Sequence, residues 1–266
     1  MMRVGQYRFE SALLAAVMLI SVLGFWDIYV GPGAKPQPHH HLHIATAFMW
    51  LLLLGTQLLL IARGSRQTHR SLGMAVLVAG PVLVATTATL SVYSAFKGVT
   101  SGEGDFLIIQ NVGVTFELGL LIFLAFLLKR RRKLHASLLL STSILFMGIA
   151  LFFALISFLP PFRIEGPETF YRFQTAGLTG QAICLATGLL FFIRDRRNGW
   201  PFLAAAACFP LNDAIRMSLT NAGLIDPLTA LVGSMSLPLT FVAAFAIMAA
   251  LLSATVLPGA RQPRTA

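Results

Sequence analysis

Long apolar stretches alternate with short polar ones along almost the whole of this 266-residue chain. A helix needs roughly 20 apolar residues to cross the hydrocarbon core of a bilayer. Eight stretches meet that need, and the segments between them are too short to hold a soluble domain. We therefore predict an all-α, polytopic integral membrane helical bundle with about eight transmembrane helices, forming a single transmembrane domain over residues 1–266. The predicted spans are about residues 11–30, 43–62, 71–94, 106–128, 135–158, 171–193, 200–220 and 228–256.

Composition indicates that lipid surrounds most of this chain. Hydrophobic residues make up 56% of it and charged residues only 11%. A soluble domain carries about 25% charged residues, so this chain cannot cover a water-facing surface. The lipid bilayer is therefore the expected partner. The net charge of +10 comes from basic residues in short loops beside lipid headgroups, so we expect no nucleic-acid binding.

Basic residues divide the loops into two sets. Fifteen lie at the two termini and in the loops after the second, fourth and sixth spans, whereas four lie in the opposite loops. The positive-inside rule places the larger set, and with it both termini, in the cytoplasm. The weakest span, 200–220, is retained because omitting it would move the basic C-terminus to the outside. The larger set is Arg3, Arg8, Arg63, Arg66, Arg70, 129–133, Arg194, Arg196, Arg197, Arg261 and Arg264; the smaller is Lys35, Lys97, Arg163 and Arg172.

Several polar side chains fall inside the predicted spans, where they are costly unless they face a partner or a water-filled cavity. Two spans carry a pair seven residues apart, about two helical turns, which places each pair on one face. Our hypothesis is a polar pocket that opens outward between spans one, four, six and seven. The alternative is internal pairing of Asp213 with Arg216 and a hydrogen-bonded Glu117, which would lock the bundle without a ligand. The pocket candidates are Asp27, Gln110, Glu117, Gln174, Gln181, Asp213 and Arg216.

Four histidines precede the second span on the outer side: His39, His40, His41 and His43. Such a cluster can bind copper or zinc, or it can be a solvated loop with incidental metal affinity. His43 also begins a stripe with Trp50 and Gln57, spaced seven residues apart. We expect that stripe to face protein rather than lipid.

His69 and His135 each open a helix on the predicted cytoplasmic side. Imidazoles from neighbouring helices can ligate one haem b or a transition metal, so these two are candidate cofactor ligands. The alternative is that both are ordinary interfacial histidines beside basic residues.

The second span and the residues after it carry a sequence pattern. It comprises His41-Leu42-His43, Trp50, Gln57, Ala62-Arg63 and Thr68-His69-Arg70-Ser71-Leu72-Gly73. This pattern resembles uncharacterised bacterial multi-span membrane proteins that share His-x-His, a Trp and a Gln along the helix, and Leu-His-Arg-x-Leu-Gly. The resemblance covers about residues 40–145 and implies a bacterial inner (cytoplasmic) membrane, without an activity. Here the related His-Lys-Arg-Leu-Met stretch is replaced by His135-Ala136-Ser137-Leu138-Leu139.

A looser resemblance is to the transmembrane b-type cytochromes, which also begin a helix with His and end it with Ala-Arg. It implies a haem held by His69 and His135, because the outer side offers only the loop cluster and His43 for a second pair.

Four functions follow from these features. The first is a redox component that binds haem or metal and meets a redox partner. The second is a transporter or an ion or proton pathway for a small solute, built on Glu117, Asp213 and Arg216. A zinc hydrolase ranks last because it needs three convergent ligands, and a purely structural role needs no site. The sequence gives no basis for an oligomeric state.

Overall fold

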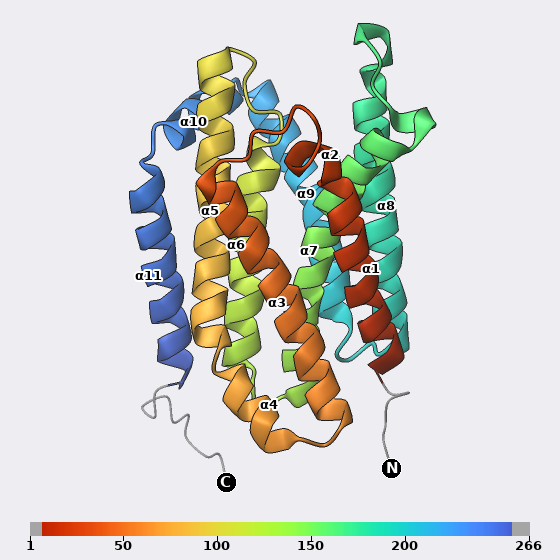
Figure 1. The fold of residues 1–266 in the computed structure, drawn as a ribbon, viewed down its shortest axis with the longest axis vertical. Coiled ribbons are helices and arrows are strands. Elements are labelled where there is room, and N and C mark those ends of the chain that lie inside the picture. Colours follow the sequence, from red (N-terminus) through yellow and green to blue (C-terminus); the bar gives the residue numbers. More distant parts are fainter. Residues whose placement is uncertain (1–6, 257–266) are drawn as a thin grey trace.

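The computed structural model describes residues 7–256, and within them it contains helices and no strands. The long helices run alternately up and down along the bundle axis, with short helices at the ends (Figure 1). The long helices are α1 (Arg8–Gly24), α3 (Pro38–Ala62), α5 (Val76–Ser101), α6 (Ile108–Leu127), α7 (Arg132–Phe158), α8 (Tyr171–Arg194), α9 (Trp200–Asn221) and α11 (Leu237–Val256). The short ones are α2 (Trp26–Tyr29), α4 (Arg66–Gly73), α10 (Ile225–Gly233) and the 3-10 turns Pro160–Phe162 and Pro167–Thr169.

Six of the long helices are long and apolar enough to cross a membrane: α3, α5, α6, α7, α8 and α11. The all-helical, multi-pass prediction agrees with this count, whereas α1 and α9 do not belong to the six. α1 has 17 residues, and α9 carries Asn212, Asp213 and Arg216.

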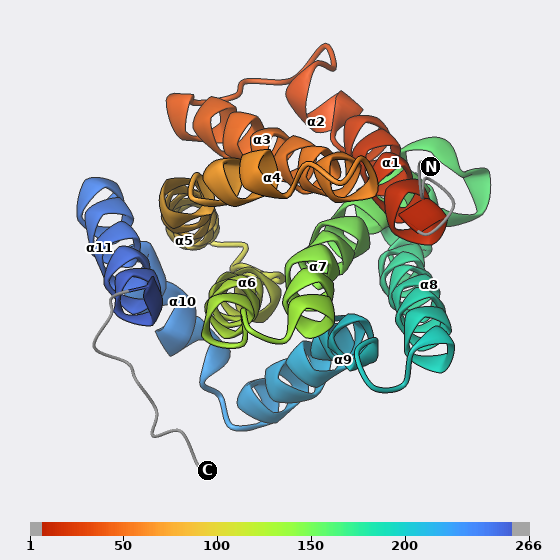
Figure 2. The same cartoon turned by 90° about the horizontal axis from the view of Figure 1, so that it is seen from below.

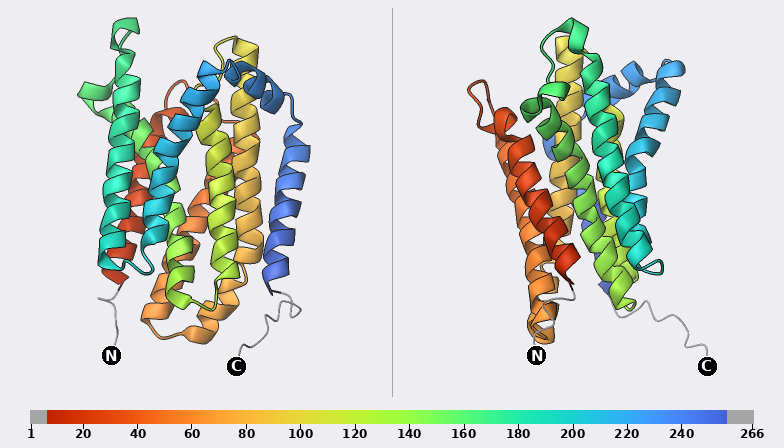
Figure 3. Two further views of the ribbon diagram at one scale, coloured as in Figure 1. Left: turned by 180° about the vertical axis from the view of Figure 1, so that it is seen from behind. Right: turned by 90° about the vertical axis from the view of Figure 1, so that its right-hand side faces the viewer.

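Three predicted spans differ from the observed helices. Residues 11–30 are divided between α1, which ends at Gly24, and the short helix α2. Residues 228–256 form two helices, because the chain leaves α10 at Gly233 and begins α11 at Leu237. Residues 71–73 belong to the separate helix α4, and the long helix that follows begins only at Val76. In all three places a short helix lies at the end of the bundle (Figure 3).

Two helices organise the interior. α7 contacts α1, α6, α8 and α9, while α5 contacts α3, α6, α10 and α11. Figure 2, along the bundle axis, shows this arrangement, with α11 at the edge. Backbones approach closely where glycine permits: a Cβ on Gly24 of α1 would lie 2.2 Å from the Ala150 carbonyl oxygen of α7. Small residues allow such close helix packing within membranes.

Large apolar side chains remain exposed on the outer surface of the bundle. Phe116 is 74% exposed, Leu239 68% and Ile247 63%. An apolar surface of this kind suits lipid and not water.

The basic turns share one end of the bundle. The α3–α4, α6–α7 and α8–α9 connections lie at the lower end in Figure 1, together with the start of α1 and the end of α11. The larger basic set predicted from the sequence, as far as it falls within residues 7–256, therefore gathers at one end. Arg3, Arg261 and Arg264 lie outside the described residues.

Candidate functional site

A cavity of about 1190 Å³ lies at the opposite end of the bundle from the basic turns. Its walls come from α1, the α2–α3 connection and helices α3, α5, α6, α7, α8 and α9. Phenylalanine side chains form much of the wall, including Phe106, Phe152, Phe173 and Phe209. A concave, mostly aromatic site with a few polar groups is the usual form of a small-molecule pocket.

Six of the seven predicted pocket residues line this cavity. They are Asp27, Gln110, Gln174, Gln181, Asp213 and Arg216. Glu117 does not line it, because it lies two turns further along α6 than Gln110, toward the basic end. The cavity is also wider than predicted, since α3 and α5 contribute His40, His43 and Tyr93.

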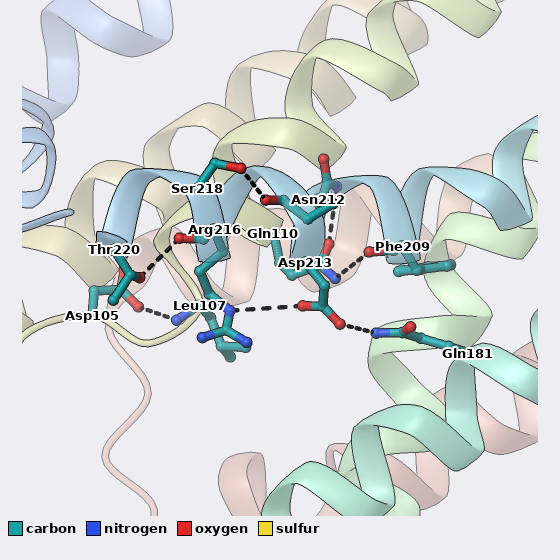
Figure 4. A network of polar contacts seen from close by, with 11 residues as sticks. Asp105, Leu107, Gln110, Gln181, Phe209, Asn212, Asp213, Arg216, Ser218 and Thr220 are labelled. Atoms are coloured by element: carbon teal, nitrogen blue, oxygen red, sulfur yellow. Dashed lines mark hydrogen bonds and ion pairs between the residues drawn. The ribbon is translucent and has the colours of Figure 1, made fainter. Parts of the chain in front are cut away.

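Asp213 and Arg216 form the charged part of the wall. The Nε atom of Arg216 lies 3.7 Å from Oδ1 of Asp213, and about a quarter of each side chain is exposed. The Gln181 side chain of α8 donates a hydrogen bond to Oδ2 of Asp213, as Figure 4 shows. The Arg216 guanidinium lies over the Phe106 ring, 4.5 Å from its centroid. The pair is thus fixed in place yet reachable from the cavity.

Asn212 joins α9 to α6 beneath this charged pair. Its amide nitrogen donates to Oε1 of Gln110 at 2.9 Å and to Oε1 of Glu117 at 2.8 Å. Gln110 in turn donates to the carbonyl oxygen of Phe209 at 3.4 Å. Asn212 is 3% exposed, and Oε2 of Glu117 is buried without a partner among the described residues. A polar connection therefore runs from the cavity wall to Glu117.

Gly113 makes room for this connection. A Cβ at Gly113 would lie 2.7 Å from both polar atoms of the Asn212 amide. Asn212 was not among the predicted site residues. The signal that could have identified it is its place beside Asp213 in the most polar span, because a buried amide in lipid requires partners.

The structure contains both a cavity beside six of the predicted residues and the internal contacts of the alternative. Asp213 pairs with Arg216, and Glu117 accepts a hydrogen bond, as the alternative required. The cavity nevertheless remains open beside the pair. The two interpretations are therefore compatible.

The four histidines of the predicted cluster lie in the first turns of α3 and have three separate sets of neighbours. His41 bonds to the Tyr29 hydroxyl, while Nδ1 of His43 lies 3.4 Å from the Thr86 hydroxyl of α5. The rings of His39 and His40 pack against Tyr93, at centroid distances of 4.2 and 5.1 Å. Within residues 7–256, no three His, Cys, Asp or Glu side chains are placed to hold a metal ion. The geometry thus does not support a copper or zinc site here.

Trp50 and Gln57 complete the stripe that begins at His43, and each contacts another helix. The indole of Trp50 donates to the Thr142 hydroxyl of α7 at 2.9 Å, and Trp50 is fully buried. When the Gln57 side-chain amide is oriented so that its nitrogen and its oxygen both form hydrogen bonds, its partners are His69 and Gly73 of α4. The prediction that this stripe faces protein is confirmed.

Hydrogen bonding occupies one ring nitrogen of both His69 and His135. The Gln57 amide donates to Nδ1 of His69, which leaves the proton of the neutral ring on Nε2 and no lone pair there for iron. Nδ1 of His135 donates to the Ala125 carbonyl oxygen at 2.7 Å. Neither imidazole lines either of the two main cavities in the described residues. Both histidines instead tie helix ends together.

Comparison with family models, with curated proteins and with solved structures finds no match for this chain. Function is therefore inferred from the site itself.

Proposed function

We propose that this chain crosses a bacterial inner membrane eight times, with both termini in the cytoplasm and lipid around the bundle. The alternating direction of the long helices supports this topology, as does the gathering of basic turns at one end. α9 has 22 residues and reaches about 33 Å at 1.5 Å per residue. α1 and α2 together cover residues 8–29 with one interruption and reach a similar length. Both are long enough for a hydrocarbon core of about 30 Å.

We further propose that the protein is a transporter that takes a small organic solute into its outer cavity. The observation that carries this proposal is the cavity of about 1190 Å³ beside the Asp213–Arg216 pair. Ligand pockets usually measure about 300–1,000 Å³, so there is room for a solute of ordinary size. A redox role ranks lower, because the hydrogen bond from Gln57 to Nδ1 of His69 places the ring proton on Nε2, which leaves His135 as the one imidazole of the pair with a free lone pair.

The lining indicates the class of solute. Aromatic rings would hold an apolar body, while Arg216 would bind an anionic group and Asp213 a cationic one. Glu117 lies below the cavity and is linked to it through Asn212 and Gln110, which gives an ion or proton a position beneath the solute. An aromatic acid or an aromatic amine satisfies this chemistry.

Solute entry is tested by cysteine labelling in intact cells. Ala214 lines the cavity, whereas the neighbouring Ile215 is 41% exposed and does not line it. In a Cys184→Ala, Cys208→Ala background, Ala214→Cys should react with a membrane-impermeant maleimide. Ile215→Cys should stay unlabelled, because a thiol in lipid does not ionise. Equal labelling of the two positions, or of neither, would contradict an outward-open cavity.

Ligand class is tested with purified protein and two probes, benzoate and benzylamine. A ligand that binds only the folded state raises Tm with its concentration. Arg216→Gln should abolish the rise caused by benzoate, and Asp213→Asn the rise caused by benzylamine. A protein that responds to neither probe, or variants that respond unchanged, would remove the pair from solute recognition.

A further inference from the structure

A second cavity, of about 720 Å³, lies at the basic end of the bundle. One wall is the α6–α7 turn with the first residues of α7, and the other is the α8–α9 turn. Figure 2 views the bundle from this end. Its lining contains Arg131, Arg132, Lys133, Arg197 and Asn198, with Asp195 as its single carboxylate.

The positive charge in this cavity is only partly neutralised by the protein, because four cationic side chains share one carboxylate. The ion pairs found within residues 7–256 are Arg172–Glu165, Arg194–Glu10 and Arg216–Asp213, and none involves a lining residue. The Asp195 carboxylate is instead occupied by Asn198, which donates to it from its backbone at 3.1 Å and from its amide at 2.9 and 3.0 Å. Four cationic groups thus face one hollow.

The hollow is also rigid on the α8–α9 side. The Asn198 and Gly199 backbone N–H groups donate to the Asp195 carbonyl oxygen at 3.1 and 2.6 Å. A Cβ at Gly199 would lie 2.2 Å from the Phe191 carbonyl oxygen, so the turn has one tight conformation. Opposite it, α7 starts at Arg132 without a side-chain cap, and its partial positive charge adds to that of the side chains. A preformed cationic hollow loses little entropy when an anion binds.

We propose that this cavity binds a phosphate group. Arginine forms paired, charge-assisted hydrogen bonds with phosphate oxygens, and basic pockets between membrane helices on the cytoplasmic side hold anionic headgroups. In the proposed topology the start of α7 lies at headgroup level, so an anionic phospholipid is the expected source. Free phosphate is the other source of the same chemistry. The proposal rests on the proposed topology but not on the larger cavity or on transport.

The test uses the purified full chain in detergent. Native mass spectrometry would count bound phosphatidylglycerol, with phosphatidylcholine as the uncharged comparison, and a thermal-shift titration would measure inorganic phosphate. The variant Arg131→Gln, Arg132→Gln, Arg197→Gln removes three lining cations. The matched control Arg63→Gln, Arg66→Gln, Arg70→Gln removes the same charge from the same end without touching either of the two main cavities. The single variant Arg197→Gln serves if the triple variant does not fold.

We expect the cavity variant to lose at least about tenfold in affinity for phosphatidylglycerol, since each basic residue near a headgroup contributes about 1 kcal/mol. The control should lose clearly less affinity, because its three arginines line neither cavity and do not converge on one hollow. A second outcome would also support the site: the protein binds inorganic phosphate, the cavity variant loses that binding, and neither lipid is preferred. The site would then be assigned to free phosphate. Equal losses in both variants, or no preference for phosphatidylglycerol and no response to phosphate, would overturn the proposal.

Discussion

At the scale of single residues, Asn212 connects the cavity wall to the carboxyl group of Glu117. It is buried and bridges α9 and α6 through two hydrogen bonds. Removing one partner of a buried polar group leaves the others unpaired, which costs about 1–3 kcal/mol. Because Gly113 makes room for this amide, it offers the cleanest way to disturb the bridge.

Gly113→Ala should destabilise the protein, whereas Gly119→Ala on the same helix should not. A Cβ at Gly113 would lie 2.7 Å from the Asn212 amide, but one at Gly119 would meet Met248 at an ordinary 3.8 Å. We expect Gly113→Ala to lower the free energy of unfolding by about 1–3 kcal/mol. The control should change it by less than about 0.5 kcal/mol. Unfolding in detergent measures both, and equal stabilities would contradict the bridge.

Residue spacing predicted some contacts and missed others. The interval of seven residues identified His43, Trp50 and Gln57 as one protein-facing stripe, because it depends on a single helix. The contact between Gln57 and His69 depends on how α4 folds back against α3, which no spacing within α3 encodes. The spacing pattern therefore gave no sign that the Gln57 amide contacts His69.

At the scale of elements, α4 is a short, strongly amphipathic helix that α3 holds in place. The Gln57 amide donates to Nδ1 and to the carbonyl oxygen of His69, and its oxygen accepts from the Gly73 N–H at 3.0 Å. Burial, with a smaller contribution from the nearby His135, lowers the pKa of His69. The docking of α4 is therefore sensitive to acid.

We expect the stability of the protein to fall as the pH drops from about 7 to 5. The folded state favours neutral His69, so the unfolded chain takes up the proton first, near pH 6.5, and gains free energy from it. His69→Gln keeps an acceptor for Gln57 and should weaken this dependence, as measured by Tm against pH, while the other histidines, which are unchanged, keep their own contributions. Burial raises the pKa of Asp105, so protonation of this carboxyl favours the folded state as the pH falls. Asp105 is present in both the original protein and the His69→Gln variant, so its effect cancels in the comparison. Parallel pH profiles would show that His69 is not the sensor.

The division of residues 228–256 shows where hydropathy alone is insufficient. The whole stretch is apolar, so the predicted span ran through it. Ser234, Ser236 and Pro238 mark the break between α10 and α11, since proline suits the first turn of a helix. Gly233 fixes the direction of α10, because a Cβ there would lie 2.9 Å from the Phe96 nitrogen of α5. That contact is tertiary and cannot be deduced from local composition.

At the scale of the whole molecule, the two ends of the bundle differ in chemistry. One end carries the basic turns and the smaller cavity, and the other carries the aromatic cavity. Hydropathy and charge predicted the helical bundle and the end at which the basic turns gather. They predicted an outer pocket from Gln110, Gln181 and Asp213, but not the contribution of α3 and α5, because helix neighbours depend on packing.

Reporter fusions test the proposed topology, including the two helices that are less apolar. Alkaline phosphatase, which is active only outside the cytoplasm, should be active when fused after Gly102 or Gly223. It should be inactive after Gly64 or Gly199. Comparing the fusions after Gly199 and after Gly223 tests α9 alone, since these two residues flank it. The same activity at both positions would show that α9 does not cross the membrane.

The Trp50–Thr142 hydrogen bond has a mechanical consequence. Leu51 and Leu145 line the larger cavity, and the neighbouring Trp50 and Thr142 are buried and do not line it. Their hydrogen bond joins α3 to α7 directly behind this part of the wall. Under the proposed transport function, any movement that opens the bundle between α3 and α7 at this level would have to break that bond.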